Sequence, residues 1–129
     1  MKISGVFTAA LKKLGLNPQV RGPDGRADRS GICFAGRSAY EIAVNGKKIL
    51  GSAQLRKAHT VLQHGSLLLT VDYERHARCM KGKAAVNARA LERKMTGLFH
   101  ETGTVDLKWI IECIVDAFKE VFNSSVTIV

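Results

Sequence analysis

The dipeptide Asn45-Gly46 is the feature that most constrains how this chain can fold. Both residues tolerate a positive φ, and such a pair between two β-prone runs is the strongest local signal for a two-residue β-hairpin. The run 40–44 supplies the first strand, and the run 47–55 supplies the returning strand. The sequence therefore predicts an antiparallel sheet that is built around this hairpin.

Other β-prone runs extend the predicted sheet. Residues 32–35 precede the hairpin, and residues 61–62 and 66–71 follow it. His64-Gly65 interrupts the two later runs, and a glycine inside a strand permits either a bulge or a close approach between two backbones. We therefore expect a mostly antiparallel sheet that is irregular at Gly65.

Helices are predicted both before and after the β-prone runs along the chain. Apolar residues recur at helical spacing over 3–14 and stop at Gly15, which favours an amphipathic helix ended by glycine. The segment 17–31 combines glycine and proline with alternating charges, which predicts a long loop. Short helices are predicted over 73–80 and 87–95.

The last helix is the clearest element of the chain. Asp106 stands at its start, and an unbroken apolar stripe follows at helical spacing. The stripe consists of Trp109, Ile110, Cys113, Ile114, Ala117, Phe118, Val121 and Phe122. We expect this helix to pack across the sheet, and residues 124–129 to add a terminal strand or to fray. Together the elements predict an α+β fold with a mostly antiparallel sheet.

Length and composition favour one globular domain. The chain has 129 residues, of which 46% are hydrophobic, so a single domain over residues 1–129 is expected. No apolar run approaches the roughly 20 residues of a membrane span, and the start lacks the pattern of a secretory signal, so we expect a cytoplasmic protein. Three widely spaced cysteines without a CxxC pair argue against a disulfide framework and against a structural metal site.

The formal net charge of +9 raises the question of a polyanionic partner. The basic residues are scattered along the chain, and the eight aromatic residues form no stacking ladder between them. No recognition-helix signature is present, so the pattern argues against a nucleic-acid binder. An acidic protein partner or a phosphate-bearing ligand would use the same charge equally well.

Two stretches of the chain resemble a known family. The first, 40–56, reads YEIAVNGKKILGSAQLR, and the second, 62–69, reads LQHGSLLL, with Cys33-Phe34 upstream. They are similar to the catalytic core of the lipoate-protein ligase and octanoyltransferase family, the biotin/lipoate A/B ligases. The resemblance is strongest to the cysteine-dependent octanoyltransferase branch. It implies the family's α+β fold, and within it only the C-terminal half of the catalytic domain.

The upstream half of the family's site has no counterpart here. Full-length members carry an Arg-Arg-x-x-Gly-Gly-Gly type segment that lines the acyl pocket, whereas this chain contains no Gly-Gly pair. Transfer depends on walls that hold both reactants in attack geometry. We therefore expect a truncated catalytic domain.

The resemblance singles out two catalytic residues, Cys33 and Lys48. Taken alone, Lys48 in a Lys-Lys pair after a turn is typical of solvated surface, and Cys33 is typical of a small buried hydrophobe. In the family, the lysine that matches Lys48 faces the reacting acyl group, where an ammonium stabilises the oxyanion. In the octanoyltransferase branch the matching cysteine is the nucleophile, and Arg29 and Arg37 near Cys33 would favour its thiolate. Strand alternation sends Lys47 to the opposite face.

Further residues of the hairpin are implied to contact substrate. They are Gly51, Ser52, Ala53, Arg56, His64 and Gly65. A glycine on a strand lets a ligand approach the backbone, although Gly51 also fits an ordinary strand bend. An orienting role and a structural role for His64 remain equally open. Cys79 and Cys113 match no motif and are expected to be structural.

Three functions remain open at this point. The first is transfer of an octanoyl or lipoyl group, through a Cys33 thioester, to a lysine of a lipoyl-accepting protein. This reaction requires no cofactor, and its partners would be an acyl carrier protein and a lipoyl-domain or glycine-cleavage H-type acceptor protein. The second is an ATP-dependent lipoate-protein ligase, with ATP and Mg²⁺ as cofactors. The third is an inactive half-domain that needs a complementary subunit, or associates with itself, through exposed sheet edges.

Overall fold

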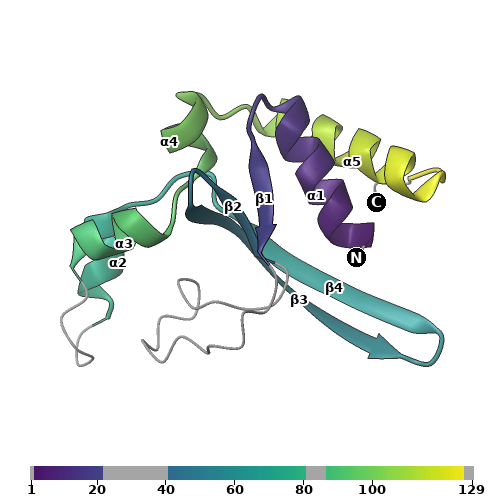
Figure 1. The fold of residues 1–129 in the computed structure, drawn as a ribbon, viewed down its shortest axis with the longest axis horizontal. Coiled ribbons are helices and arrows are strands. Elements are labelled where there is room, and N and C mark those ends of the chain that lie inside the picture. Colours follow the sequence, from purple (N-terminus) through teal and green to yellow (C-terminus); the bar gives the residue numbers. More distant parts are fainter. Residues whose placement is uncertain (1, 22–40, 81–86, 127–129) are drawn as a thin grey trace.

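The structure is a computed structural model, and it describes residues 2–21, 41–80 and 87–126. In chain order its elements are α1 (Lys2–Lys13), β1 (Pro18–Arg21), β2 (Glu41–Val44), β3 (Lys47–Lys57), β4 (Thr60–Leu67), α2 (Tyr73–Arg78), α3 (Ala88–Lys94), α4 (Leu98–Thr102) and α5 (Leu107–Phe122). Within the described residues, the strands form one antiparallel sheet in the order β1-β2-β3-β4 (Figure 1). The predicted α+β class is confirmed.

The hairpin between β2 and β3 forms where the sequence predicts it. Asn45 and Gly46 have φ values of 50° and 78°. Both values are positive, as a type I′ turn requires, and Val44 pairs directly with Lys47 across the turn. The turn is tied down from a neighbouring strand, because Arg21 Nη2 donates to the Gly46 carbonyl oxygen at 2.7 Å.

Two details of the predicted sheet are wrong. Part of the expected loop 17–31 is the edge strand β1, in which Pro18 pairs with Val44 and Arg21 with Glu41. Pairing with β2 overrides the local loop chemistry here, and proline is tolerated at the first residue of an edge strand. The strand β4 is continuous through Gly65 and ends at Leu67, so no bulge interrupts it. The run 32–35 lies outside the described residues.

One face of the sheet packs against helices. The main core cluster unites β2 and β3 with α1, α4 and α5 through Leu11, Ile42, Val44, Ile49, Leu50, Leu98 and Ile110. The expected packing of α5 across the sheet is only partly correct. Ile110, near the start of α5, reaches this core, whereas most of the helix lies beside α1 (Figure 1).

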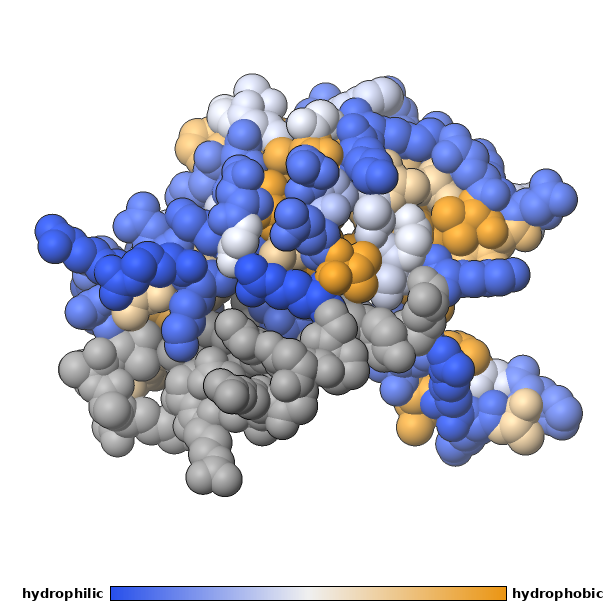
Figure 2. All heavy atoms as spheres, viewed as in Figure 1, coloured by the Kyte–Doolittle hydropathy of each residue, from blue (hydrophilic) through white to orange (hydrophobic). Residues whose placement is uncertain are grey.

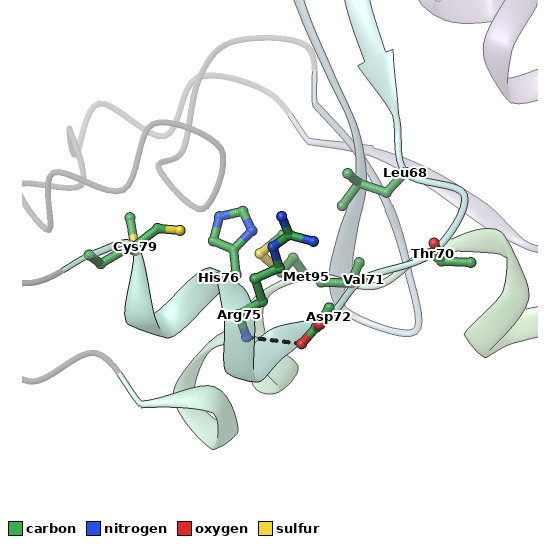
Figure 3. Close-up of a pocket in the computed structure, with 9 residues that line it drawn as sticks. Leu68, Thr70, Val71, Asp72, Arg75, His76, Cys79 and Met95 are labelled. Atoms are coloured by element: carbon green, nitrogen blue, oxygen red, sulfur yellow. Dashed lines mark hydrogen bonds between the residues drawn. The ribbon is translucent and has the colours of Figure 1, made fainter.

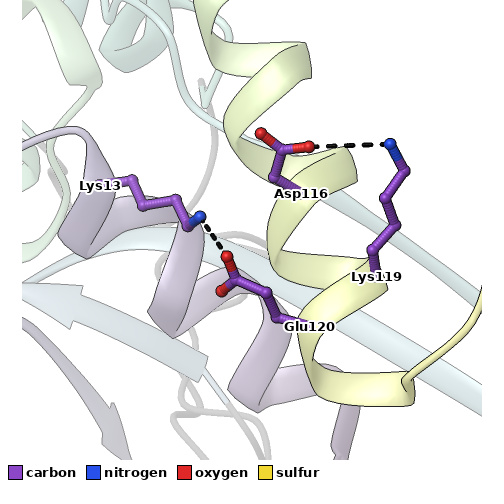
Figure 4. A network of polar contacts seen from close by, with 4 residues as sticks. All are labelled: Lys13, Asp116, Lys119 and Glu120. Carbon is purple, nitrogen blue, oxygen red and sulfur yellow. Dashed lines mark hydrogen bonds and ion pairs between the residues drawn. The ribbon is translucent and has the colours of Figure 1, made fainter.

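The interface between α1 and α5 is a second core. Cys113 is 2% exposed and packs with Val6, Ala10 and Ala117, as expected for a structural cysteine. Burial raises the pKa of the Cys113 thiol, which keeps it protonated and unreactive. At the edge of the interface, Lys13 Nζ and Glu120 Oε1 form an ion pair at 2.6 Å, beside the Lys119–Asp116 pair on α5 (Figure 4).

The helix ends follow their sequence signals. The Asp106 carboxylate caps α5 by accepting from the Trp109 amide at 3.1 Å, and Asn87 caps α3 in the same way at 2.8 Å. The short helix α4 was not predicted, because its five residues are too few to show a periodicity. Residues 124–126 form no strand.

The hairpin of β3 and β4 extends well past β1 and β2 and projects from the body of the molecule (Figure 1). We call residues 52–65, from Ser52 to its cross-strand partner Gly65, the arm. The space-filling view shows the arm as a separate lobe that carries both hydrophobic and hydrophilic residues (Figure 2). In the described part of the chain, no helix is long and apolar enough to span a membrane.

Candidate functional site

Lys48 is the second residue of β3 and lies at the buried end of this strand, next to the hairpin turn. The residue is 5% exposed, and its Nζ donates to Glu41 Oε1 at 2.7 Å. The two side chains are only 6% and 3% exposed, so the ion pair is shielded from water. Lys48 is therefore not the solvated surface residue that its local sequence suggests.

The register of the hairpin explains this pairing. Lys48 stands opposite Ala43, and cross-strand partners share a face of the sheet. Strand alternation places Glu41 on that same face and sends Ile42 and Val44 to the opposite, core-packed face. Because Ala43 is small, the lysine side chain can pass over it and reach Glu41. The pair thus lies on the face of the sheet that points away from the main core.

A β-bulge follows immediately after Lys48. Ala43 pairs with Lys48, but Ile42 pairs with Leu50, so Ile49 is an extra residue on β3. Both Ile49 and Leu50 belong to the main core. Without the extra residue, alternation would place Lys48 on the same face as Leu50. The bulge therefore turns the lysine out of the hydrocarbon core and toward Glu41.

The backbone of Lys48 is held by a segment distant in sequence. The Thr96 amide donates to the Lys48 carbonyl oxygen at 2.9 Å, and Met95 forms a parallel bridge with Lys48. Glu101 fixes this segment, because its carboxylate accepts from Thr96 Oγ1 at 2.8 Å and from Asn45 Nδ2 at 2.7 Å. The backbone position of Lys48 is thus fixed by a segment that lies far along the chain.

The energetics of the Lys48–Glu41 pair suggest a role other than stability. Taking two charges out of water costs several kcal/mol per ion, and apolar residues of similar size are often as stabilising as a buried pair. Sequence reasoning missed Glu41, although the register of the Asn45-Gly46 hairpin places it on the Lys48 face.

The predicted substrate-binding residues are split between the two faces of the hairpin. Three pairs face one another across β3 and β4: Gly51 with Ser66, Ser52 with Gly65, and Ala53 with His64. Since Leu50 points into the core, alternation from it puts Gly51, Ala53 and His64 on the Lys48 face. The same alternation puts Ser52, Gly65 and Arg56 on the opposite face of the sheet. The structure therefore does not bring all of them together.

Distance separates Arg56 from the lysine as well. At about 3.3 Å per residue, the eight positions from Lys48 to Arg56 span about 26 Å. The Arg56 side chain is exposed, and its Nε donates to Gln54 Oε1 at 2.6 Å. His64 is exposed too, opposite Ala53, about 16 Å along the strand from Lys48. Neither side chain forms a compact site with Lys48.

Gly65 is explained by the packing of the two strands. A Cβ atom at this position would lie 2.7 Å from the Gly51 carbonyl oxygen and 3.1 Å from the Ser52 Cβ. Real Cβ atoms essentially never come as close as the first of these distances. Of the two explanations for the glycine, the close backbone approach is the one observed.

A pocket of about 400 Å³ opens beside the segment that supports Lys48. Its lining residues are Leu68, Thr70, Val71, Asp72, Arg75, His76, Cys79, Met80 and Met95 (Figure 3). Met95 connects the pocket to Lys48 through the parallel bridge. Cys79, which was expected to be structural, is exposed and lines this pocket. Across the described ranges, no three acidic, histidine or cysteine side chains are placed to hold a metal ion.

The wall behind the pocket is apolar and well anchored. Leu91 and Met95 are fully buried and pack with Leu68 and Tyr73, among others. The Tyr73 hydroxyl donates to the Met95 carbonyl oxygen at 3.1 Å, and burial raises the pKa of this phenol. Cys33, the predicted nucleophile, lies outside the described residues, so its approach to Lys48 stays a prediction.

Comparison with known proteins assigns the family. Residues 1–119 match the model of the lipoyl protein ligase A/B catalytic domain. The octanoyltransferase LipM of Carboxydothermus hydrogenoformans is 32% identical over 128 residues, which covers 95% of this chain and 48% of that protein. The chain belongs to the lipoyl protein ligase A/B catalytic domain family, as its resemblance implied. It spans about half the length of this relative.

Solved structures show the same fold. A lipoate-protein ligase A crystallised with ATP aligns with a TM-score of 0.71 at 17% identity, over 99% of this chain and 48% of that one. A bi-partite lipoate protein ligase from Thermoplasma acidophilum aligns with a TM-score of 0.67 at 15% identity, over 99% of this chain and 47% of that one. Almost every residue of this chain thus has a structural counterpart in proteins about twice as long.

Proposed function

We propose that this chain contributes Cys33 and Lys48 to an acyltransferase site that moves an octanoyl or lipoyl group in protein lipoylation. The observation that carries the proposal is the Lys48 ammonium, held at 2.7 Å by Glu41 on a buried part of β3. The membership of the chain in a lipoyl ligase family and its similarity to an octanoyltransferase support the choice of acyl group.

The ion pair defines what Lys48 can do. An ammonium that donates to a carboxylate has no lone pair on nitrogen, so it cannot attack a carbonyl carbon. It can stabilise the negative charge that develops on a carbonyl oxygen, and in a shielded site this stabilisation is far larger than in water. Glu41 acts as a positioning residue, because it orients the ammonium without contacting the acyl group.

The proposed reaction has two steps. The Cys33 thiolate attacks the carbonyl carbon of an acyl thioester on a carrier protein; a new C–S bond forms, and the carrier thiolate leaves and takes up a proton. The ε-amine of a lysine on a lipoyl-accepting protein then attacks the Cys33 thioester. A C–N bond forms, the amine loses a proton to solvent, and the Cys33 thiolate is regenerated. Lys48 donates to the developing oxyanion in both steps.

The test is acylation of the protein by octanoyl-acyl carrier protein, followed by mass spectrometry. We expect a covalent octanoyl adduct that is absent from Cys33→Ala and present in Cys79→Ala. Cys79→Ala is the matched control, because Cys79 is an exposed cysteine that the proposal does not use. An adduct that persists in Cys33→Ala would refute the cysteine as the acyl acceptor.

Two other outcomes would select the alternatives. Octanoylation or lipoylation of an acceptor domain that requires ATP and Mg²⁺, and that survives in Cys33→Ala, would identify a ligase. An adduct that forms only when the remaining part of the catalytic domain is added would identify a subunit. The second outcome keeps the roles of Cys33 and Lys48 and places the missing walls of the acyl pocket on another polypeptide.

A further inference from the structure

Among the described residues, no further strand pairs with the two strands of the arm. In β3, pairing with β2 stops at Leu50, so beyond that residue β3 is paired with β4 alone in the described part of the sheet. A hairpin of two strands is at best marginally stable in water, and its outer edges offer amide and carbonyl groups to another strand. The arm is therefore an incomplete piece of sheet.

The tip of the arm carries an apolar patch. Leu55 and Leu62 are cross-strand partners that are 56% and 62% exposed. Alternation from Leu50 puts Leu55 and Leu62 on the face that also carries Lys48. A partner that covers this patch would therefore lie over the same face as the lysine.

The charge of the arm restricts what that partner can be. No aspartate or glutamate occurs in the arm, whereas it contains Arg56 and Lys57. A complementary surface would be apolar at its centre and acidic at its rim. A second copy of the arm would bring like charges together, and this disfavours self-association through the same surface.

We propose that the arm is the docking surface for the remaining part of the catalytic domain. That part adds a strand to the edge of β4 that no described strand covers, and it packs over the Leu55–Leu62 patch, which places it over the Lys48 face. The activity of the complex rests on the proposed function, whereas the docking rests on the structure of the arm. The relatives are about twice as long as the part that this chain matches, and this supports the unmatched part of the domain as the occupant.

The experiment uses the full chain co-expressed with a tagged polypeptide. The probe is the part of the Carboxydothermus hydrogenoformans octanoyltransferase that this chain does not match, about half of that protein. We expect the two to copurify, and we expect amide hydrogens of residues 52–65 to exchange more slowly in the complex. Leu62→Asp should weaken binding at least tenfold, because an interface is most sensitive at its buried apolar centre.

The matched control is Leu107→Asp. Leu107 is 57% exposed, against 62% for Leu62, and lies at the start of α5, so the two variants introduce the same charge at equally exposed leucines. We expect Leu107→Asp to bind within about twofold of the unmutated chain. Circular dichroism and the unfolding midpoint of each variant exclude misfolding as the cause of lost binding.

Four results would overturn the docking surface. The first three are failure of the two polypeptides to associate, unchanged binding by Leu62→Asp, and slowed exchange on α5 in place of the arm. A homodimer that buries the arm and excludes the probe would overturn it in favour of a second copy. All of these readouts measure binding, so they are independent of octanoyl transfer, whose failure would refute the proposed function alone.

Discussion

The two ends of strand β3 have opposite characters. Near the turn at Asn45-Gly46, Lys48 to Leu50 are buried, and Lys48 is anchored through Glu41 and the Thr96 amide. Toward its other end the strand becomes half of the arm, where Leu55 and Arg56 are exposed. One strand thus joins the buried, anchored segment around Lys48 to a surface that no other described element covers. Substitutions at the two ends should therefore differ in kind as well as in size.

The largest effect is expected at Glu41. Glu41→Ala leaves the Lys48 ammonium buried without this carboxylate, and breaking a buried pair typically costs about 3–5 kcal/mol of unfolding free energy. Urea denaturation followed by circular dichroism measures the loss. On the arm, Arg56→Ala should change the unfolding free energy by less than about 0.5 kcal/mol, as exposed substitutions usually do. Equal losses at the two positions would contradict the contrast between the two ends.

A somewhat smaller loss is expected when the support of Lys48 is cut. Glu101→Ala removes the carboxylate that accepts from Thr96 and Asn45. Hydrogen bonds to a charged group contribute about 1.5–3 kcal/mol, and Thr96 is 1% exposed, so its hydroxyl would lose a buried partner. We expect a loss of about 2 kcal/mol in the same denaturation experiment. Glu92→Ala, at an exposed acidic residue of α3, is the control and should have no such effect.

A third effect concerns the junction between the body and the arm. Gly65→Ala forces a Cβ against the Gly51 carbonyl oxygen, so the strands must shift apart, at a cost of about 1–2 kcal/mol. In the control Gly5→Ala the new Cβ meets nothing within 4 Å, and alanine favours the helix, so stability should rise slightly. If Gly65→Ala were as stable as the unmutated chain, the close approach would not constrain the hairpin.

The smallest effect is expected at the α1–α5 edge. Lys13 and Glu120 form a short contact at 2.6 Å, but both side chains reach solvent, at 34% and 60% exposure. Exposed pairs contribute little, because water and salt screen them. Lys13→Met should leave the unfolding midpoint unchanged within error, at low and at high salt. A clear loss that disappears at high salt would show that this pair matters more than its exposure implies.

Local signals in the sequence were enough for the parts of the fold that depend on neighbours in the chain. The Asn45-Gly46 turn and the Asp106 cap of α5 belong to this group, because a positive φ and a side-chain cap are local properties. The strand β1 was missed, since only pairing with β2 makes residues 18–21 extended.

The surroundings of Lys48 were harder to predict than the hairpin that carries it. Lys48 was identified through the family pattern, but its partner Glu41 emerges only from the strand register. The bulge at Ile49 has no local signal, and it decides which residues of β3 share a face with Lys48. Thr96 supports the lysine from a segment that is about fifty residues away, and no pattern in the sequence connects the two.

The proposed role of Lys48 in acyl transfer can be separated from its role in the fold with the double variant Glu41→Leu/Lys48→Met. Replacing a buried ion pair by apolar residues of similar size leaves stability about unchanged. The measurement is the rate at which the Cys33 octanoyl adduct forms. It is made under the conditions in which the unmutated chain is acylated, either alone or with the remaining part of the domain added. We expect a folded protein whose rate is lower by about a hundredfold or more, the usual loss when an oxyanion donor is removed. A stable double variant that is acylated at the unmutated rate would show that the buried lysine has no part in the reaction.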